Sequence, residues 1–247
     1  MVLTAIPDAI ATSTRLQSNM QTSLFGLGQL NFGALAAPPQ HLDDHSSVVF
    51  EPGWLQGSDQ VFDQLRDQMA WQAMERPMYG RVVAVPRLIC TVDPGSLDVT
   101  HPLAIITRGL ESALHRRFSS VGLNFYRTGD DSVSWHRDSI RGTRRPQTVA
   151  LVSIGSPRTL AMRPHSSYCS KTAETTRITS ATGRRWRLGH GDLLVMRGRC
   201  QHDWEHCVPK ERAAGPRISL AFRCQGVNED PRSTATGVTT LLESHKL

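Results

Sequence analysis

The chain has 247 residues, of which 39% are hydrophobic and 20% charged, and its formal net charge is +6 at neutral pH. This length is that of one ordinary domain with extensions, and it is sufficient to bury a hydrophobic core. No run of about 18 apolar residues occurs, so we expect no membrane-spanning helix. The first residues carry no basic stretch, so we also expect no secretory signal there.

The positive charge is concentrated in the second half of the chain. Residues 116–223 hold 20 of the 28 basic side chains and 8 of the 22 acidic ones. Such a concentration attracts polyanions and favours a nucleic-acid partner. The alternative is a basic surface without a partner, because 25 of the basic residues are Arg and 3 are Lys, as an Arg-rich codon bias would produce.

The cysteines are odd in number, and none belongs to a Cys-x-x-Cys pair. They are Cys90, Cys169, Cys200, Cys207 and Cys224. This usage favours reduced thiols, so we expect a cytoplasmic protein. We infer no membrane association and no obligate protein partner.

The first 120 residues are expected to supply an extension and supporting helices. Residues 1–45 hold few charges and several stretches with small residues, Pro or Gly, which predicts a loosely ordered extension. Apolar residues recur at helical spacing within 59–74, and a second apolar stripe follows Pro102 and reaches Phe118. We therefore expect helical support over residues 46–120.

Beyond residue 120 the pattern changes to short apolar segments separated by Gly and Pro. The predicted strands are 121–127, 133–138, 148–155, 158–164, 184–189, 191–198, 204–210 and 217–223. Eight short strands after two helices predict a mostly β fold, a double-stranded β-helix or jelly roll over 121–224 with buttressing helices. We place the whole domain at residues 46–226, with a surface loop at 165–183 and a C-terminal tail at 227–247.

One pair of residues on a predicted strand indicates a metal site. His136 and Asp138 are two positions apart, so their side chains point to the same face of the strand. With His206 from a later strand they complete two imidazoles and one carboxylate, the facial triad that leaves open positions on a non-haem Fe(II). The alternative is that these histidines are ordinary surface or core residues, since the chain has ten.

A second group of same-face residues indicates an anion site. Arg217, Ser219 and Arg223 share one face of the last predicted strand, and Asn124 and Tyr126 can point inward from the first. A buried guanidinium is costly without an anionic partner, so we expect a dicarboxylate to meet these arginines. The alternative is that the arginines pair with Asp or Glu on the barrel surface.

Two further arginine clusters allow two interpretations each. Arg137, Arg141, Arg144 and Arg145 crowd the segment after the predicted metal strand, where they would either grip nucleic-acid phosphates or lie in a solvated loop. In the run 184–187, alternation favours two arginines on a solvated face and the tryptophan packed beneath.

Five motifs in this order resemble the AlkB family of Fe(II)- and 2-oxoglutarate-dependent dioxygenases, which repair alkylated nucleic acid. They are Asn124-x-Tyr126, Trp135-His136-x-Asp138, His190-Gly191-Asp192-Leu193-Leu194-Val195-Met196, Trp204-x-His206-x-Val208-Pro209 and Arg217-x-Ser219-x-x-x-Arg223. The resemblance covers residues 78–224. It implies that Fe(II), 2-oxoglutarate and O2 are used, and that His136, Asp138 and His206 hold the iron.

The resemblance also implies how the co-substrate is held. Asn124, Tyr126 and Arg217 would receive the distal carboxylate of 2-oxoglutarate. Arg223 would meet the carboxylate beside the keto group. At Ser219 many members have Asn, so the polar side chain that reaches towards the co-substrate or Arg223 is shorter in this chain.

The substrate side departs further from the family pattern. Members often have an acidic residue two positions after the Asp of the metal motif, whereas this chain has Ile140. They also often have an aromatic residue for base stacking after the Pro86-Arg87 motif, a role that Tyr79 or Trp71 would have to take here. The expected substrate-binding residues are Tyr79, Arg87, Arg137 and Arg141.

The resulting hypothesis is oxidative demethylation of alkylated bases in DNA or RNA, such as 1-methyladenine and 3-methylcytosine, with release of formaldehyde, succinate and CO2. One alternative is the same oxygenase chemistry on a protein side chain or a small metabolite. Another is a non-catalytic nucleic-acid-binding module with a vestigial barrel.

Overall fold

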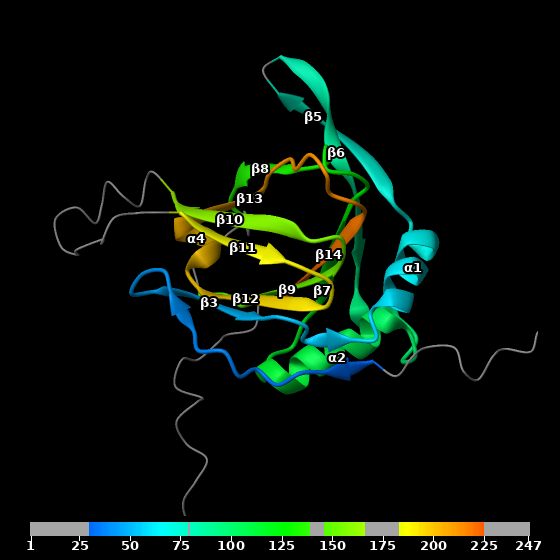
Figure 1. Ribbon diagram of the computed structural model, residues 1–247, viewed down its shortest axis with the longest axis vertical. Helices are drawn as coiled ribbons and strands as arrows, with labels where there is room; N and C mark the ends of the chain where they lie inside the picture. Colours follow the sequence, from blue (N-terminus) through cyan, green and yellow to red (C-terminus); the bar gives the residue numbers. More distant parts are fainter. Residues whose placement is uncertain (1–29, 79, 139–145, 166–182, 225–247) are drawn as a thin grey trace, which may run out of the picture.

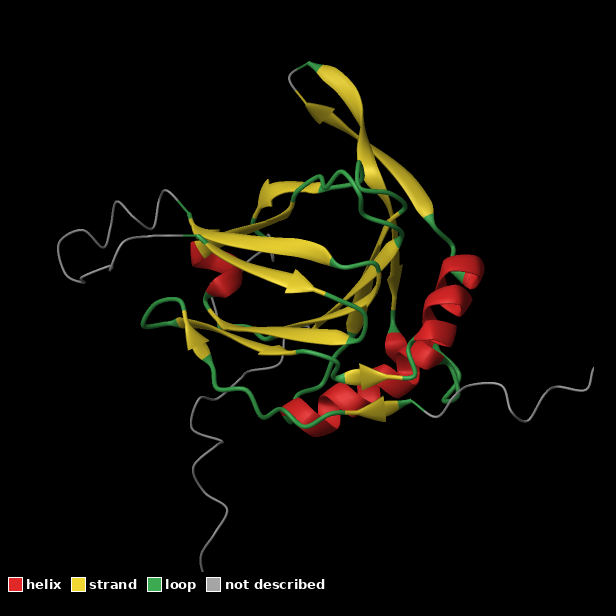
Figure 2. Cartoon of the chain, viewed as in Figure 1, coloured by secondary structure: helices red, strands yellow, loops and turns green. Residues whose placement is uncertain are grey.

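The computed structural model describes residues 30–78, 80–138, 146–165 and 183–224. Their core is two antiparallel sheets that face each other, with helices against the outer side of the larger sheet (Figures 1 and 2). This arrangement confirms the predicted jelly roll with buttressing helices. Among the described helices, none is long and apolar enough to cross a membrane.

The larger sheet has eight strands in the order β2-β3-β12-β9-β14-β7-β6-β5. Their bounds are β2 Gln40–His41, β3 Ser46–Glu51, β5 Gln72–Met78, β6 Arg81–Val92, β7 Ser120–Tyr126, β9 Val149–Gly155, β12 Asp192–Gly198 and β14 Arg217–Arg223. The central strands β9, β12 and β14 are almost entirely buried. The nearly continuous apolar runs of β9 and β12 are typical of strands covered on both faces, whereas β14 alternates polar and apolar residues.

The smaller sheet has the order β11-β10-β13-β8. Its strands are β8 Val133–His136, β10 Arg158–Pro164, β11 Arg184–Leu188 and β13 Trp204–Val208. A short helix, α4 (Cys200–Asp203), leads directly into β13. All eight predicted barrel strands are therefore present as β7 to β14, with ends that differ from the predicted ones by at most two residues.

Two hydrophobic cores lie on either side of the larger sheet. One lies between the two sheets and includes Leu151, Met162 and Trp186. The other lies between the larger sheet and helices α1 (Asp59–Gln68) and α2 (Pro102–Leu114), with Leu65 and Leu110 among its members. The helices thereby fix the position of the larger sheet, from which the anion-site residues come.

Helix α2 begins and ends at residues that suit these positions. Pro102 occupies the first turn, where a missing N–H costs nothing, and His101 caps the helix by accepting a hydrogen bond from the Leu103 amide at 3.2 Å. The helix ends at His115, which adopts the left-handed conformation with φ of 52°. A 3₁₀ turn, η1 (Pro94–Ser96), precedes the helix.

The region 46–120 contains more than the expected helical support. The helix predicted over 59–74 ends at Gln68, and β5 and β6 follow as a long hairpin that extends beyond the barrel (Figure 1). The sequence from Arg81 to Val92 is rich in Val, a strand signal that the helical interpretation of this region overlooked. Strand β6 pairs with β7 and so joins the larger sheet.

Part of the expected N-terminal extension is also packed. The short strand β1 (Asn31–Phe32) pairs with β4 (Leu55–Gln56), and β2 pairs with β3. Phe32 lies against the Trp54 ring at 5.0 Å between centroids and covers Gly109 of α2, where a Cβ would meet its ring at 2.7 Å. Tertiary contacts thus order residues 30–45, which have little local preference of their own.

Candidate active site

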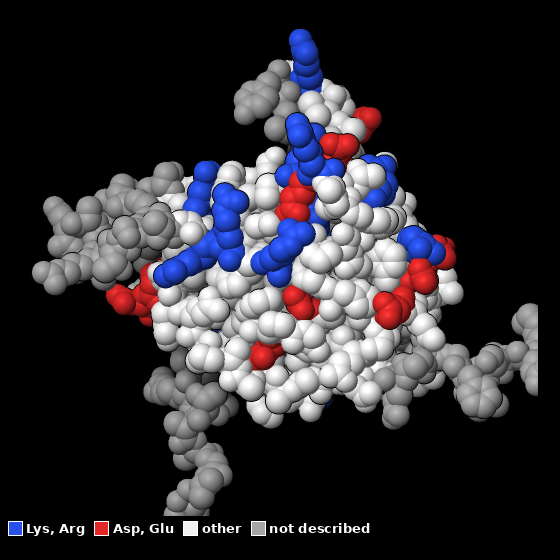
Figure 3. All heavy atoms as spheres, in the orientation of Figure 1, with Lys and Arg blue, Asp and Glu red and all other residues white. Residues whose placement is uncertain are grey.

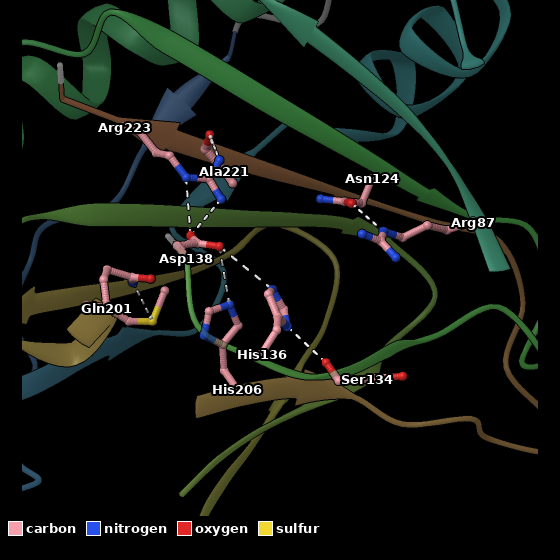
Figure 4. A network of polar contacts seen from close by, with 10 residues as sticks. Arg87, Asn124, Ser134, His136, Asp138, Gln201, His206, Ala221 and Arg223 are labelled. Atoms are coloured by element: carbon pink, nitrogen blue, oxygen red, sulfur yellow. Dashed lines mark hydrogen bonds and ion pairs between the residues drawn. The ribbon is translucent and has the colours of Figure 1, made fainter. Parts of the chain in front are cut away.

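The two histidines of the predicted triad come from neighbouring strands of the smaller sheet. His136 ends β8, and His206 lies opposite it on β13 in the antiparallel register. Their ring centroids are 4.3 Å apart. Asp138 lies two residues beyond His136, and its Oδ1 is 3.7 Å from His136 Nε2 and 4.0 Å from His206 Nε2 (Figure 4).

The three side chains form a donor set that fits a metal ion. One ligand atom from each residue lies within 4.8 Å of the other two. His136 Nδ1 donates to the Ser134 carbonyl oxygen at 2.9 Å, which leaves the Nε2 lone pair available on the Asp138 side. Two neutral imidazoles and one carboxylate are the facial set that suits Fe(II).

Asp138 uses its two oxygens differently. Oδ1 faces the histidines, and Oδ2 accepts from Arg223 Nη2 at 2.8 Å and Nε at 3.3 Å (Figure 4). Burial raises the pKa of Asp138, but the charge and hydrogen bonds of Arg223, together with the two histidines, outweigh this effect, so the pKa lies below its usual value. The carboxylate is therefore ionised at neutral pH and held in a fixed orientation.

His206 is kept neutral by its surroundings. Burial, with a smaller contribution from His136, lowers its pKa to about 4, although Asp138 acts in the opposite direction. Its side chain is 10% exposed. A neutral imidazole is the form that binds a metal, so His206 needs no deprotonation near neutral pH.

A second polar cluster lies in the barrel, around Arg217 at the start of β14. Arg217 is 2% exposed, its Nε donates to Ser153 Oγ at 2.9 Å, and its guanidinium lies over the Tyr126 ring at 5.3 Å. Burial lowers the pKa of Arg217, and the nearby Tyr126 hydroxyl opposes this shift. Burial has the opposite effect on the Tyr126 hydroxyl, whose pKa it raises, because in both residues burial disfavours the charged form.

One donor of this cluster has no partner among the described residues. Arg217 Nη1 is buried without a hydrogen bond. A buried guanidinium N–H left in this way costs free energy, about 1–3 kcal/mol, which an anionic ligand would recover. The donors of Arg217 and Tyr126 therefore fit a carboxylate, as 2-oxoglutarate would provide, while Ser153 holds the guanidinium by accepting from its Nε.

Comparisons with known proteins agree with this chemistry. Residues 103–223 match the model of the 2OG-Fe(II) oxygenase superfamily. The chain is 32% identical over 207 residues to "Alpha-ketoglutarate-dependent dioxygenase alkB homolog 3" from Bos taurus, covering 76% of this chain and 68% of the relative. The human protein of the same name is 32% identical over 203 residues with the same coverage.

The chain belongs to the AlkB family. It is 32% identical over 203 residues to "DNA oxidative demethylase ALKBH2" from Arabidopsis thaliana, covering 71% of this chain and 63% of the relative. A solved structure described as "The structure of OsALKBH1" has a TM-score of 0.51 and 15% identity, covers 75% of this chain and 100% of its own, and supports the fold.

As an AlkB-family member the protein is an Fe(II)- and 2-oxoglutarate-dependent dioxygenase. Bound iron, with 2-oxoglutarate and O2, supplies the oxidising chemistry. The protein's own residues hold the donor set, keep Asp138 ionised and His206 neutral, and present buried N–H donors to a carboxylate. Retention of all these groups argues against a vestigial barrel.

In this AlkB-family chain the other predicted co-substrate residues, Asn124, Ser219 and Arg223, also have defined neighbours. Asn124 Oδ1 accepts from Arg87 Nε at 2.7 Å, so Arg87 reaches the polar cluster from β6. Ser219 is buried on β14 and pairs with Asn124 in the register of β7 and β14. Arg223 lies on Asp138, so its contact with 2-oxoglutarate stays a prediction.

The expected substrate residues are not brought together among the described residues. Arg137 is exposed and donates to the His202 carbonyl oxygen at 3.2 Å. Arg87 contacts Asn124 rather than an open surface. Tyr79 and Arg141 lie outside the described residues, as do Arg144 and Arg145.

Two residues of the polar cluster were missed in the sequence. Ser153 is the one polar side chain in the apolar run Val149–Gly155 of β9, and this isolation was a usable signal. Arg158 is fully buried at the start of β10 and lies over the Tyr126 ring at 5.3 Å. Position at a strand end next to Pro157 made Arg158 resemble an ordinary surface arginine.

Proposed function

We propose that this protein removes alkyl groups oxidatively from bases in DNA or RNA, such as 1-methyladenine or 3-methylcytosine, and releases formaldehyde, succinate and CO2. The observation that carries the proposal is the His136, Asp138 and His206 donor set in a chain 32% identical to relatives of the alkB type, one of which bears the name DNA oxidative demethylase. Family membership supplies the chemistry, and the relative's name suggests the substrate.

Within this proposal the residues have separate tasks. His136, Asp138 and His206 hold the iron. Arg217 and its neighbours receive the distal carboxylate of 2-oxoglutarate, and Arg223 orients Asp138 while meeting the carboxylate beside the keto group. The neighbours in this site are Asn124, Tyr126, Ser153 and Ser219.

The charge distribution supports a nucleic-acid substrate. Arg163, Arg184, Arg185 and Arg187 are exposed on β10 and β11 of the smaller sheet. Figure 3 shows Lys and Arg side chains gathered over this sheet on the face turned to the viewer. His136 and His206 lie on the inner side of the same sheet. Phosphates bound to this surface would therefore lie on the outer side of the sheet that carries the metal site. We include Tyr79, Arg87, Arg137 and Arg141 as substrate-binding residues in the proposal.

The cytoplasmic location is part of the same proposal. Cys90, Cys200, Cys207 and Cys224 are free thiols among the described residues, which supports a reducing compartment.

The direct test is formaldehyde release from an oligonucleotide that carries 1-methyladenine or 3-methylcytosine, with Fe(II), ascorbate and 2-oxoglutarate present. Release that depends on 2-oxoglutarate would support the demethylase. Succinate without formaldehyde would redirect the same oxygenase chemistry to a protein side chain or a small metabolite. Absence of both products from iron-loaded protein would contradict the proposal.

A further inference from the structure

Arg158 is a buried cation that the proposed reaction does not use. It is 0% exposed and lies at the start of β10, between the two sheets. Its Nη2 donates to the carbonyl oxygens of Asp131 and Pro209 at 2.7 Å each, and its Nη1 donates to the Thr128 carbonyl at 3.1 Å. Arg158 thus joins the turn after β7 to the segment after β13.

These hydrogen bonds give three N–H donors of the guanidinium an acceptor, but they do not neutralise its charge. Carbonyl oxygens are dipoles, and within the described parts of the chain no carboxylate lies in an ion pair with Arg158 or with Arg217. The acidic groups nearby make their direct ion pairs elsewhere, Asp131 with Arg127 and Glu211 with Arg187, and act on Arg158 and Arg217 only at longer range. Burial of such a charge is costly unless an anion meets it.

Arg158 and Arg217 share one aromatic neighbour. Each guanidinium carbon is 5.3 Å from the centroid of the Tyr126 ring. Each arginine also keeps one buried nitrogen without a hydrogen bond, Nε in Arg158 and Nη1 in Arg217. Two like charges on one buried tyrosine repel each other, and the interaction contributes to the lowered pKa of Arg217. A negative group placed beside them would be strongly favoured.

We propose that Arg158 is a positioning and specificity residue of the co-substrate pocket, whose charge makes the pocket select a ligand with a second carboxylate. The inference rests on the proposed function, because it assumes that Arg217 receives the distal carboxylate of 2-oxoglutarate. Arg158 acts through Tyr126 and the local field and does not itself touch the reacting atoms.

The experiment compares two ligands that differ only at the far end. 2-Oxopentanoate has the chain length of 2-oxoglutarate with a methyl group in place of the distal carboxylate. Calorimetry on Mn(II)-loaded protein without O2 measures the dissociation constant of each ligand in the absence of turnover. The measured quantity is the preference for 2-oxoglutarate, given as the ratio of the two dissociation constants.

In Arg158→Gln we expect this preference to fall by about ten-fold, since a unit charge at several ångströms in a protein interior contributes at that level. The dissociation constant of 2-oxopentanoate should change by less than about two-fold, because that ligand carries no distal charge. Arg108→Gln, an exposed arginine of α2 outside the two sheets, is the matched control and should keep the full preference.

Arg158→Lys keeps the charge but cannot reproduce the three carbonyl bonds, and it covers the case in which Arg158→Gln does not fold. A folded lysine variant should retain the preference within about three-fold. Loss of the preference in that variant, or its full retention in a folded Arg158→Gln, would overturn the proposal.

Arg217→Gln separates this inference from the proposed function. If Arg217→Gln loses the preference and Arg158→Gln keeps it, the pocket is where we place it and Arg158 has no part in selection. If Arg217→Gln also keeps the preference, the co-substrate site itself is misplaced.

Discussion

At the scale of single residues, the site depends on how Asp138 is shared. Its Oδ1 faces two histidines, whereas its Oδ2 is held by Arg223 from the last strand of the larger sheet. This division keeps one oxygen available for a metal and prevents the carboxylate from turning away. Hydrogen bonds from a neighbouring residue to a metal ligand, such as those from Arg223 to Asp138, orient the ligand and tune metal affinity.

Removal of a donor should abolish turnover without unfolding the protein. In His136→Ala or Asp138→Ala we expect no 2-oxoglutarate-dependent succinate, because two donors do not hold Fe(II) in the facial arrangement. Succinate formation and circular dichroism measure the two properties. Asp130→Ala, an exposed aspartate of the turn after β7, should retain wild-type turnover. Wild-type rates in either triad variant would refute the assignment.

Gly122 offers a test of the Arg223 contact that leaves every donor in place. A Cβ at this position would lie 2.9 Å from Arg223 Nη1, so Gly122→Ala should displace the guanidinium from Asp138. Loss of such a support typically lowers metal affinity by about 10- to 100-fold. Titration with Mn(II) measures it.

Gly33→Ala is the matched control, because its Cβ would make ordinary contact with Trp54 at 3.5 Å, outside the polar cluster. Unchanged metal affinity in Gly122→Ala, with its fold retained, would show that Arg223 is not needed to orient Asp138.

At the scale of elements, helix α2 holds the larger sheet from outside and depends on an unusual cap. His101 Nδ1 accepts a hydrogen bond from the Leu103 amide, which it can do only when that nitrogen is unprotonated. Burial lowers the pKa of His101 below its usual value, with Asp98 opposing the shift. The unfolded state therefore binds more protons, and this contribution to stability is lost as pH falls below about 6.5.

His101→Asn should remove this pH dependence and keep the cap, since Asn is a good capping residue. We expect the loss of unfolding free energy between pH 7.5 and 5.5 to be smaller in His101→Asn than in the wild type, as measured by urea denaturation. His101→Ala should lower the free energy of unfolding by about 1 kcal/mol at pH 7.5. Equal losses in the wild type and His101→Asn would exclude His101 as the titrating group.

At the scale of the whole molecule, the basic charge lies mostly in the barrel segment. Residues 116–223 carry 20 of the 28 basic side chains, and several are exposed on the smaller sheet. If phosphates bind there, counterion release makes affinity fall steeply with salt. The same surface would steer a nucleic acid towards the sheet that carries His136 and His206.

Binding to a single-stranded oligonucleotide should therefore weaken between 50 and 200 mM salt, with a logarithmic slope of about −0.7 for each phosphate contacted. Fluorescence anisotropy measures this slope. A peptide nucleic acid of the same sequence, which has no phosphates, is the control and should bind weakly at every salt concentration. A slope near zero for the DNA would count against a phosphate-binding surface.

Local patterns in the sequence were sufficient to predict the barrel strands and the residues that alternate on them. Period-two alternation predicts which side chains share a strand face, so the eight barrel strands and the pairing of His136 with Asp138 could be read locally. The same local reading failed at β5 and β6, where a helical interpretation was carried past Gln68 into a Val-rich hairpin.

Which charged groups meet depends on how distant strands pack. Arg223 contacts Asp138 because β14 lies between β7 and β9 of the larger sheet, while β8 belongs to the facing sheet. This proximity cannot be predicted from the spacing of the two residues in the sequence. The same holds for two further contacts: Ser153, from the larger sheet, bonds Arg217, and Arg158, from the smaller sheet, lies over Tyr126. Alternation is set by the backbone of each strand, whereas pairing between charges depends on how distant strands pack together.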